Sequence, residues 1–204
     1  MNRIITIGRE FGSGGREIGL LLSEKLGIPF YDKEIITLTA EAGGISEDLI
    51  KAHEEGIGLA GKKIASRMKY ASFMYSPSLS DSIFLHQCDA IRKLASSGPC
   101  VIVGRCADYV LRDMGSVNVF IASAMDSKVK RKRAMAPEKA DYTEKEFEKW
   151  ISDVNEARCN YYEHYTKQGW GRIQNYHLCI HSDLCGIQGA VDTIIAYLSA
   201  IEKK

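Results

Sequence analysis

Short apolar runs alternate with helical patterns along the whole chain. RIITI (3–7), IPFY (28–31), CVIV (100–103), VNVFIA (117–122) and YHLCIHS (176–182) have the β-branched and aromatic content of buried strands. Between them, apolar residues recur at helical spacing, as from Ile18 to Leu26. Strands separated by helices predict an α/β fold in which a five-stranded parallel sheet is flanked by helices on both faces.

Capping residues mark where several helices begin or end. Gly27 is a candidate C-cap directly after the first helical stretch, and Ser46 is a candidate N-cap before EDLI. Thr143 and Glu146 form a capping box that opens a long helix. No repeat, low-complexity segment or linker divides the pattern, so we expect a single domain over residues 1–204.

A glycine-rich stretch follows the first strand directly. IITIGREFGSGGREIG contains five glycines within the twelve residues from Gly8 to Gly19, and a helical pattern begins there. Such a loop aims several backbone N–H groups at one point, and the helix N-terminus adds partial positive charge. Glycine allows the positive φ and the close approach that a phosphate cradle needs. A tight turn without a ligand is the alternative, and the number of glycines disfavours it.

Two phosphate-binding motifs compete for this loop. The dinucleotide motif G-x-G-x-x-G, with an acid about 20 residues further on, is matched by Gly12, Gly14 and Asp32. Its third glycine would be Glu17, a bulky acid at a position of close helix–strand contact. A dinucleotide-dependent oxidoreductase is therefore the least favoured alternative.

The mononucleotide motif G-x-x-x-x-G-K-[ST] lacks its lysine here. Aligned on Gly14, the motif places Gly15 in the lysine position. Aligned on Gly15, it places Arg16 there and Glu17 at the hydroxyl position. Neither alignment matches the motif fully, and both stay open. Arg9 and Arg16, which flank the loop, are the candidates for the charge of the missing lysine.

Six stretches spread over the chain resemble one known family, in the order in which the family has them. They are IGREFGSGGREIG, LGIPFYDKEII, VIVGRCADYVL, VFIASAMDSKVKRKRA, NEARCNYYEHYT and GWGRIQNYHLCIHS. The family is the cytidylate kinase-like proteins, a divergent branch of the nucleoside monophosphate kinases. The resemblance implies a three-layer P-loop kinase fold with a helical acceptor-binding insert at about 33–97 and an arginine-rich lid at about 130–158. It also implies transfer of the γ-phosphoryl group of ATP, with Mg²⁺, to a nucleoside monophosphate such as CMP or dCMP.

Phosphoryl transfer depends on cations that converge on the transferred group. Arginine is suited to this role because its guanidinium binds two phosphate oxygens at once. The loop and the resemblance together assign catalytic roles to Arg16, Arg131, Arg133 and Arg158, and ATP-phosphate binding to Gly8, Arg9, Gly12, Ser13, Gly14, Gly15, Arg16 and Glu17. The basic run KVKRKRAM (128–135) keeps an alternative interpretation as an exposed helix face.

Polar residues also follow the ends of two further strands. We assign Asp32, Arg105 and Asp108 to the acceptor site, because ligands of parallel sheets bind beyond the carboxyl ends of the strands. Asp32 has an alternative role as N-cap of the helix that begins with KEII. We assign Mg²⁺ to Ser13 and Glu17, since carboxylate and hydroxyl oxygens suit this ion.

The last strand carries a second set of chemically active side chains. His177, Cys179, His181 and Cys185 form the pattern H-x-C-x-H-x₃-C. On a strand the first three would share one face, which allows metal ligation. We expect this strand to be buried, so a structural role is favoured over a metal site.

Composition and charge limit the partners. The 204 residues carry a formal net charge of +1, which gives no support for a nucleic-acid or membrane partner. No apolar run approaches the ~20 residues needed to span a bilayer. The six cysteines are scattered without a CxxC pair, which indicates buried, reduced thiols and a cytoplasmic protein. We therefore expect small-molecule nucleotides as partners; the sequence does not indicate an oligomeric state.

The missing lysine also motivates a second hypothesis. The chain would then be a nucleotide-binding protein without nucleoside monophosphate kinase activity, or a kinase for a different small-molecule acceptor. Arg16→Ala separates the two hypotheses, because catalysis falls by orders of magnitude if Arg16 replaces the lysine.

Overall fold

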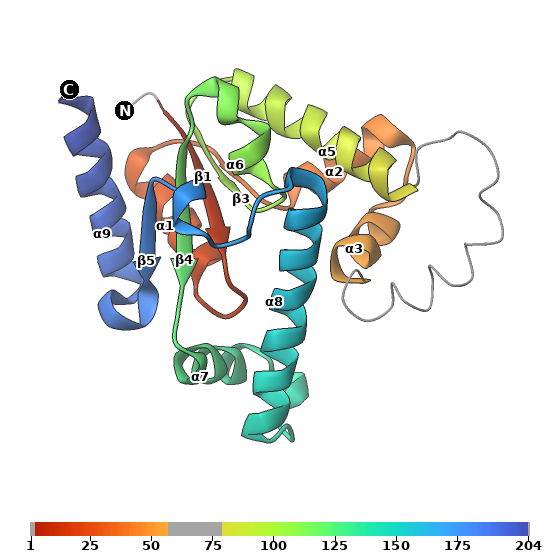
Figure 1. Ribbon diagram of the computed structural model, residues 1–204, viewed down its shortest axis with the longest axis vertical. Coiled ribbons are helices and arrows are strands. Elements are labelled where there is room, and N and C mark those ends of the chain that lie inside the picture. The colour runs from red at the N-terminus through yellow and green to blue at the C-terminus, as the bar shows by residue number, and fades with distance from the viewer. Residues whose placement is uncertain (1–2, 57–78, 204) are drawn as a thin grey trace.

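A parallel sheet forms the centre of the protein. The computed structural model describes residues 3–56 and 79–203. Within these residues the strands are β1 (Ile4–Arg9), β2 (Phe30–Tyr31), β3 (Cys100–Val103), β4 (Val117–Ala122) and β5 (Leu178–His181). They pair in parallel in the order β2-β3-β1-β4-β5 (Figure 1). The predicted five-stranded parallel sheet is confirmed, and its order places the carboxyl ends of β1 and β3 side by side.

Helices connect the strands. They are α1 (Gly15–Leu26), α2 (Glu34–Gly43), α3 (Glu47–Gly56), α5 (Leu79–Ser96), α6 (Ala107–Val110), α7 (Met125–Met135), α8 (Glu144–Thr166) and α9 (Ser182–Glu202). Short 3-10 turns lie at Arg112–Met114, Pro137–Lys139 and Ile173–Asn175. Residues 57–78 of the expected helical insert lie outside the described residues.

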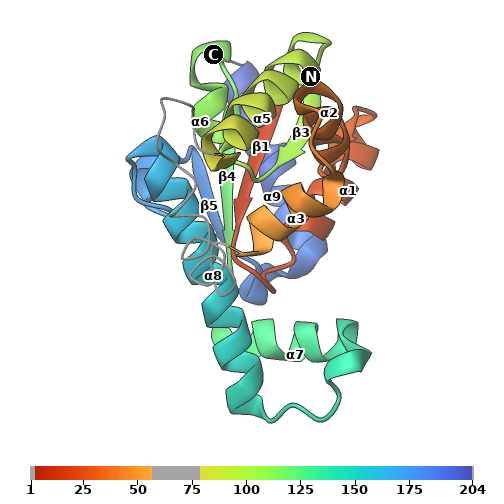
Figure 2. The ribbon, with the colours of Figure 1, turned by 90° about the vertical axis from the view of Figure 1, so that its right-hand side faces the viewer.

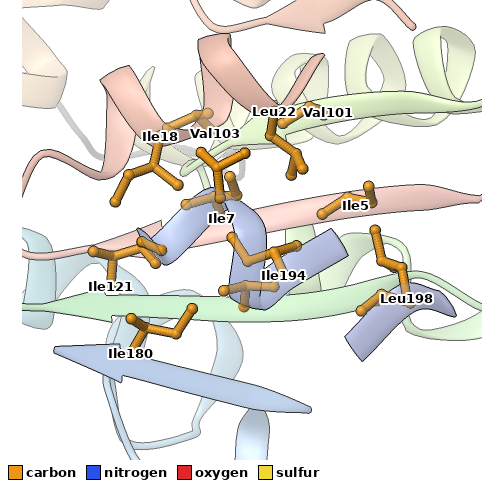
Figure 3. Close-up of a cluster of buried hydrophobic side chains, with 14 residues drawn as sticks. Ile5, Ile7, Ile18, Leu22, Val101, Val103, Ile121, Ile180, Ile194 and Leu198 are labelled. Atoms are coloured by element: carbon orange, nitrogen blue, oxygen red, sulfur yellow. The ribbon is translucent and has the colours of Figure 1, made fainter. Parts of the chain in front are cut away.

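Side chains alternate between the two faces of the sheet, and helices cover each face. Val101 and Val103 of β3 pack in one apolar cluster with α1 and α9, which Figure 3 shows. Cys100 and Ile102 of the same strand point into a second cluster with α2, α5 and α6. The two-residue period of a strand sends alternate side chains to opposite faces, so one short strand serves both clusters. The result is the predicted three-layer α/β arrangement.

The predicted capping residues are confirmed. Gly27 ends α1 in the left-handed region with φ 64°. The backbone N–H of Leu49 donates to Ser46 Oγ at 3.3 Å at the start of α3. At the start of α8, the N–H of Thr143 donates to Glu146 Oε2 at 2.7 Å, and the N–H of Glu146 donates to Thr143 Oγ1 at 3.4 Å. Local hydrogen bonds of this kind can be recognised in the sequence because both partners lie within four residues.

α7 and α8 form a hairpin that extends away from the sheet. Val129 of α7 packs against Phe147 and Ile151 of α8 in a small buried cluster. Figure 2 shows α7 and the first half of α8 projecting from the body of the molecule. This hairpin covers the region assigned to the lid, 130–158, and its own apolar cluster holds the two helices together.

The last strand differs from the expectation. Within the described residues β5 forms an edge of the sheet and pairs with β4, and its Cys179 is exposed, so the prediction of a buried strand is wrong. All six cysteines are free, but only Cys88, Cys100 and Cys106 are buried. The expectation of buried thiols therefore holds for half of them.

α9 packs on the sheet as a core helix. It continues across a kink at Gly186, where φ is 69°. By length and composition alone α9 could cross a membrane, with a mean hydropathy of 1.5. Its side chains Ala190, Val191, Ile194 and Leu198 are buried in the main apolar cluster, and 22% of its apolar window is buried in all.

Candidate active site

The glycine loop between β1 and α1 is held by its carbonyl groups. Gly12 and Gly14 have φ of 84° and 81°, which residues with a Cβ atom rarely adopt. Ser182 Oγ donates to the carbonyl of Ser13 at 2.6 Å, and Arg131 Nη1 donates to the carbonyl of Gly12 at 2.9 Å. The loop is thus fixed between α9 on one side and α7 on the other.

Glu10 connects the loop to β4 and to the hairpin. Its Oε2 accepts from the N–H of Ser123 at 3.1 Å and from Lys128 Nζ at 3.0 Å. A Cβ atom on Gly12 would lie 3.0 Å from the Cβ of Lys128, so loop and helix are in close contact. The first turns of α7 are therefore in direct contact with the loop.

Asp32, directly after β2, binds two arginines. Its Oδ2 accepts from Arg16 Nε at 2.6 Å, and its Oδ1 accepts from Arg105 Nη1 at 3.1 Å. Burial raises the pKa of Asp32, but Arg105, Arg16 and Arg9 outweigh burial and lower the pKa overall. Asp32 is therefore a charged carboxylate that orients arginines. The N-cap of α2 is Lys33, without a side-chain cap bond, so the alternative of Asp32 as a cap is wrong.

The turn after β3 is strained. Gly104, Arg105 and Cys106 have consecutive φ values of 79°, 53° and 56°. The left-handed region of backbone conformation costs a residue with a Cβ atom roughly 1–2 kcal/mol. The turn brings the Arg105 guanidinium to within 2.7 Å of the carbonyl of Asp32 and starts α6, which carries Asp108. Strain of this kind collects at functional sites.

Asp108 has different surroundings. Tyr162 Oη donates to Asp108 Oδ2 at 2.6 Å, and both residues are buried. Burial raises the pKa of Asp108 by more than the hydrogen bond from Tyr162 lowers it. The hydroxyl of Tyr176 is buried nearby without a hydrogen-bond partner of good geometry. A buried polar atom in that state is available to a ligand.

A cavity of about 570 Å³ lies between these groups. Its described lining comprises Gly8, Arg9 and Phe11; Gly104, Arg105, Cys106 and Asp108; Trp150, Asp153, Val154, Ala157, Arg158, Tyr161 and Tyr162 of α8; and Trp170 and Tyr176. Three of these residues are arginines and six are aromatic. The cavity therefore combines positive charge with flat apolar surfaces.

Lys132 adds a further cation beside the loop. Its Nζ lies over the ring of Phe11, 3.8 Å from the centroid. Burial, with the charges of Arg158 and Arg131, lowers the pKa of Lys132. Arg158 Nη1 in turn donates to the carbonyl of Arg9 at 3.2 Å. Cations this close repel one another, and a bound polyanion would relieve that repulsion.

The sequence profile of the cytidylate kinase-like family matches residues 4–184. The chain belongs to the cytidylate kinase-like family. No curated protein sequence matches the chain.

Solved structures place this cytidylate kinase-like chain among known folds. An uncharacterized protein from Eubacterium ventriosum is 28% identical, with a TM-score of 0.68 over 97% of this chain and 98% of that one. The shikimate kinase from Bacteroides thetaiotaomicron is 14% identical, with a TM-score of 0.56 over 98% and 99%. The Acinetobacter baumannii shikimate kinase, in complex with shikimate, is 14% identical, with a TM-score of 0.54 over 100% and 96%. These likenesses show a P-loop kinase fold, and family and fold support nucleotide-dependent phosphoryl transfer of the kinase type.

Many of the residues assigned from the sequence meet at the cavity of the cytidylate kinase-like chain. Arg9, Arg105, Asp108 and Arg158 line it. Asp32 holds Arg105 at the cavity through the two hydrogen bonds described above. Residues far apart in the sequence are therefore brought together at the carboxyl ends of β1, β2 and β3, as such a sheet requires.

Two assigned arginines point elsewhere. Arg133 Nη1 donates to the carbonyl of Tyr142 at 3.2 Å, and its guanidinium lies over the ring of Phe147 at 4.6 Å. Arg133 thus braces the hairpin. The side chain of Arg16 is 55% exposed and pairs with Asp32, so its charge is already compensated outside the cavity lining.

The assigned Mg²⁺ ligands do not fit an ion site. Ser13 is fully buried and its Oγ donates to the carbonyl of Glu10 at 2.8 Å. Glu17 is exposed on the first turn of α1. Among the side chains that the structure describes, in residues 3–51 and 79–203, no three His, Cys, Asp or Glu side chains converge on a point that would hold a metal.

The H-x-C-x-H pattern on β5 gives no metal site among the residues that the structure describes. His177 Nδ1 accepts from the backbone N–H of Asn118 at 2.9 Å. His181 Nδ1 lies 3.6 Å from Asp183 Oδ1. Each imidazole has a separate local partner, so the alternative of a shared metal is not supported.

Sequence reasoning missed most of the cavity wall on α8. Trp150, Asp153, Ala157 and Tyr161 follow one another at spacings of three or four residues and therefore share one face of the helix. The spacing was visible in the sequence. Its mixture of aromatic, small and charged residues does not match the apolar stripe that identifies a core face.

Proposed function

We propose that the chain transfers the γ-phosphoryl group of ATP to a nucleoside monophosphate, with CMP or dCMP as the preferred acceptor. The observation that carries this proposal is the cavity, in which three arginines lie together with six aromatic side chains. An acceptor that has its own phosphate and a planar base needs both kinds of contact.

The arginines suit the acceptor phosphate because one of them is fixed in advance. The side chain of Arg105 is only 9% exposed, and Asp32 accepts two hydrogen bonds from its Nη1. A guanidinium held in this way does not reorganise when the phosphate binds. Arg9 and Arg158 line the same cavity and share a hydrogen bond from Arg158 Nη1 to the Arg9 carbonyl.

The aromatic wall suits the base. Phe11 and Trp150 are in edge-to-face contact with ring centroids 4.9 Å apart, and Trp170 packs edge-on to Phe120 at 5.4 Å. Rings held this firmly offer faces on which a base stacks. An acceptor without a planar ring, such as shikimate, would leave this wall without a partner.

We assign the phosphates of ATP to the glycine loop and to the cations of the hairpin. Arg131 already bonds to the loop, and Lys132 lies beside it over Phe11. Closure of the hairpin would exclude water, which otherwise competes as acceptor. ATP enters as its Mg²⁺ complex, in which nucleotide oxygens and water supply most ligands of the ion.

A coupled assay with ATP and Mg²⁺ tests the proposal. CMP, dCMP, UMP, AMP, GMP and shikimate are offered in turn, and we expect the highest kcat/KM with CMP or dCMP. Trp170→Leu is expected to raise KM for CMP about tenfold without changing KM for ATP. Ile173→Ala, at an exposed position of the same segment, is the matched control.

The same assay identifies the second candidate function. ATP binding without turnover of any acceptor would refute a nucleoside monophosphate kinase and leave a nucleotide-binding protein. Turnover with shikimate alone would refute the nucleotide acceptor and leave a kinase for a different small molecule.

A further inference from the structure

Gly15 is a glycine for reasons of space. It is the first residue of α1 and, unlike Gly12 and Gly14, does not have a left-handed φ. A Cβ atom at this position would collide with the Cβ of Arg9 and lie 3.0 Å from its Cγ. The Arg9 side chain therefore excludes a lysine at position 15, where one alignment of the P-loop motif requires it.

A second glycine makes room for the other end of the same side chain. A Cβ atom on Gly104 would collide with Nη1 of Arg9 and lie 2.8 Å from its Cζ. Gly15 begins α1 and Gly104 follows β3, so the two glycines come from different parts of the chain. Arg9 lies between them in what we call the two-glycine slot. The absence of a Cβ atom at both glycines leaves room for the stem and for the guanidinium of this side chain.

The slot joins the phosphate loop to the cavity. Arg9 ends β1 directly before the loop, and it also lines the cavity. Its charge is close enough to Asp32 to contribute to the lowered pKa of that carboxyl. The guanidinium thus lies between the loop that we assign to ATP and the cavity that we assign to the acceptor, where the transferred group must pass.

We propose that Arg9, held in the slot formed by Gly15 and Gly104, replaces the missing loop lysine and binds the β- and γ-phosphates of the donor. The inference rests on the proposed function, because it takes ATP as the donor. A lysine side chain at position 15 and the arginine side chain at position 9 would compete for the same space beside the loop. Only one of the two side chains fits.

Binding measured without an acceptor tests this assignment. Titration calorimetry compares ATP with AMP, which lacks the β- and γ-phosphates. Arg9→Gly is expected to weaken ATP binding about 10- to 100-fold, as expected for lost charged hydrogen bonds. AMP binding is expected to change by less than about threefold. If Arg9→Gly does not fold, Arg9→Gln takes its place, because glutamine fills the slot without the charge. The same loss of ATP affinity is expected. Arg92→Gln, on the exposed side of α5, is the matched control.

Relocating the cation provides the sharper test. Arg9→Gly combined with Gly15→Lys returns the charge to the usual position of the motif. Glycine is needed at position 9 because the collision involves the Cβ of Arg9. We expect the double variant to recover at least about tenfold of the lost ATP affinity. Gly15→Lys alone is expected to lose ATP binding or to fail to fold, because Arg9 still occupies the slot.

Three results would overturn the assignment. They are native ATP affinity in Arg9→Gln, native affinity in Gly15→Lys, and a folded double variant that binds ATP no better than Arg9→Gly. A native chain that binds ATP but phosphorylates no nucleoside monophosphate refutes the proposed acceptor only. The ATP and AMP titrations then still decide the role of Arg9.

Discussion

Two aspartates at one edge of the sheet have opposite surroundings. Asp32 pairs with Arg16 and Arg105, whereas Asp108 accepts a hydrogen bond from Tyr162. Both are buried, at 8% and 7% exposure, so burial alone cannot distinguish them. Burial raises the pKa of both, but arginines reverse the shift for Asp32 and nothing as strong acts on Asp108. The neighbours decide the charge of each carboxyl.

The difference separates two tasks within one cavity. In the proposed reaction, the charged Asp32 orients Arg105 toward the acceptor phosphate. Asp108, whose pKa is raised by burial, lies with Tyr162 on the other side of the cavity, where the pair can hydrogen-bond to the base of the acceptor. The arginine side of the cavity therefore recognises charge, and the aromatic side recognises the neutral part of the acceptor.

Asp32→Asn is expected to have the largest effect. Arg105, with a side chain only 9% exposed, would lose the carboxylate of Asp32. Removing one partner of a buried ion pair costs about 3–5 kcal/mol, and we expect the free energy of unfolding to fall by about 3 kcal/mol. We expect kcat/KM for CMP to fall about 100-fold, because Arg105 is no longer oriented. Urea unfolding and the coupled kinase assay measure these two quantities.

The control for Asp32→Asn is an exposed ion pair. Asp192 accepts from Lys25 Nζ at 2.9 Å on the surface, and Asp192→Asn is expected to leave the free energy of unfolding almost unchanged. Equal losses in the two variants would contradict a special role for the buried pair. The contribution of Asp32 is present above about pH 4 and is lost as the pH falls through its lowered folded pKa.

Tyr162→Phe tests the other side of the cavity. The variant removes the hydroxyl that donates to Asp108 at 2.6 Å and leaves a buried carboxyl without that donor. We expect a loss of about 1–2 kcal/mol in stability and an increase of about tenfold in KM for CMP. KM for ATP should stay within about threefold, since the loop is untouched. Tyr197→Phe, in α9, removes a hydroxyl far from the cavity; the same rise in KM there would show that the effect is not specific.

Asp108→Asn tests the protonation of Asp108 directly. An unfolded aspartate titrates near pH 3.9, and the folded pKa of Asp108 is higher. Between these values the folded state binds more protons, so native stability falls as the pH rises, by at most about 1.4 kcal/mol per pH unit. The asparagine of the variant does not titrate, so the free energy of unfolding of the variant does not fall in this way. The difference between variant and native chain should therefore shift in favour of the variant as the pH rises from about 4 to the folded pKa of Asp108. Asp32→Asn should show the opposite trend below about pH 4, where Asp32 of the native chain becomes protonated. Urea titrations from about pH 2 to about pH 8 measure both trends. A pH-independent difference for Asp108→Asn would count against a raised pKa.

Strand ends and caps could be predicted from the sequence because their determinants are local. The capping box of Thr143 and Glu146 involves residues three positions apart, and the alternation in Cys100–Val103 serves two helical layers. Asp32 and Asp108 could be assigned to one site because both follow strand ends. The opposite directions of their pKa shifts could not, since these depend on burial and on partners distant in the sequence, such as Arg105 for Asp32.

The phosphate loop also depends on a partner that is distant in the sequence and that the sequence pattern does not reveal. The sequence reveals that the lysine is missing, and it offers Arg9 and Arg16 as replacements. Whether Gly15 serves backbone conformation or space depends on its φ and on its neighbours. The partner that distinguishes the two arginines, Gly104, belongs to a strand end far along the chain. No pattern within the loop contains that information.

Arg16→Ala is expected to have the smallest effect, although one alignment of the loop motif gives Arg16 the place of the lysine. Its side chain is 55% exposed, and Asp32 keeps Arg105 as a partner when Arg16 is removed. An ion pair of this exposure contributes about 0–1 kcal/mol, and that contribution shrinks as salt is added. We expect turnover within about threefold of the native value, measured beside Arg9→Gln in one assay at two ionic strengths. A loss of 100-fold in Arg16→Ala would instead make Arg16 the loop cation, and the close fit of Arg9 between two glycines would then be packing alone.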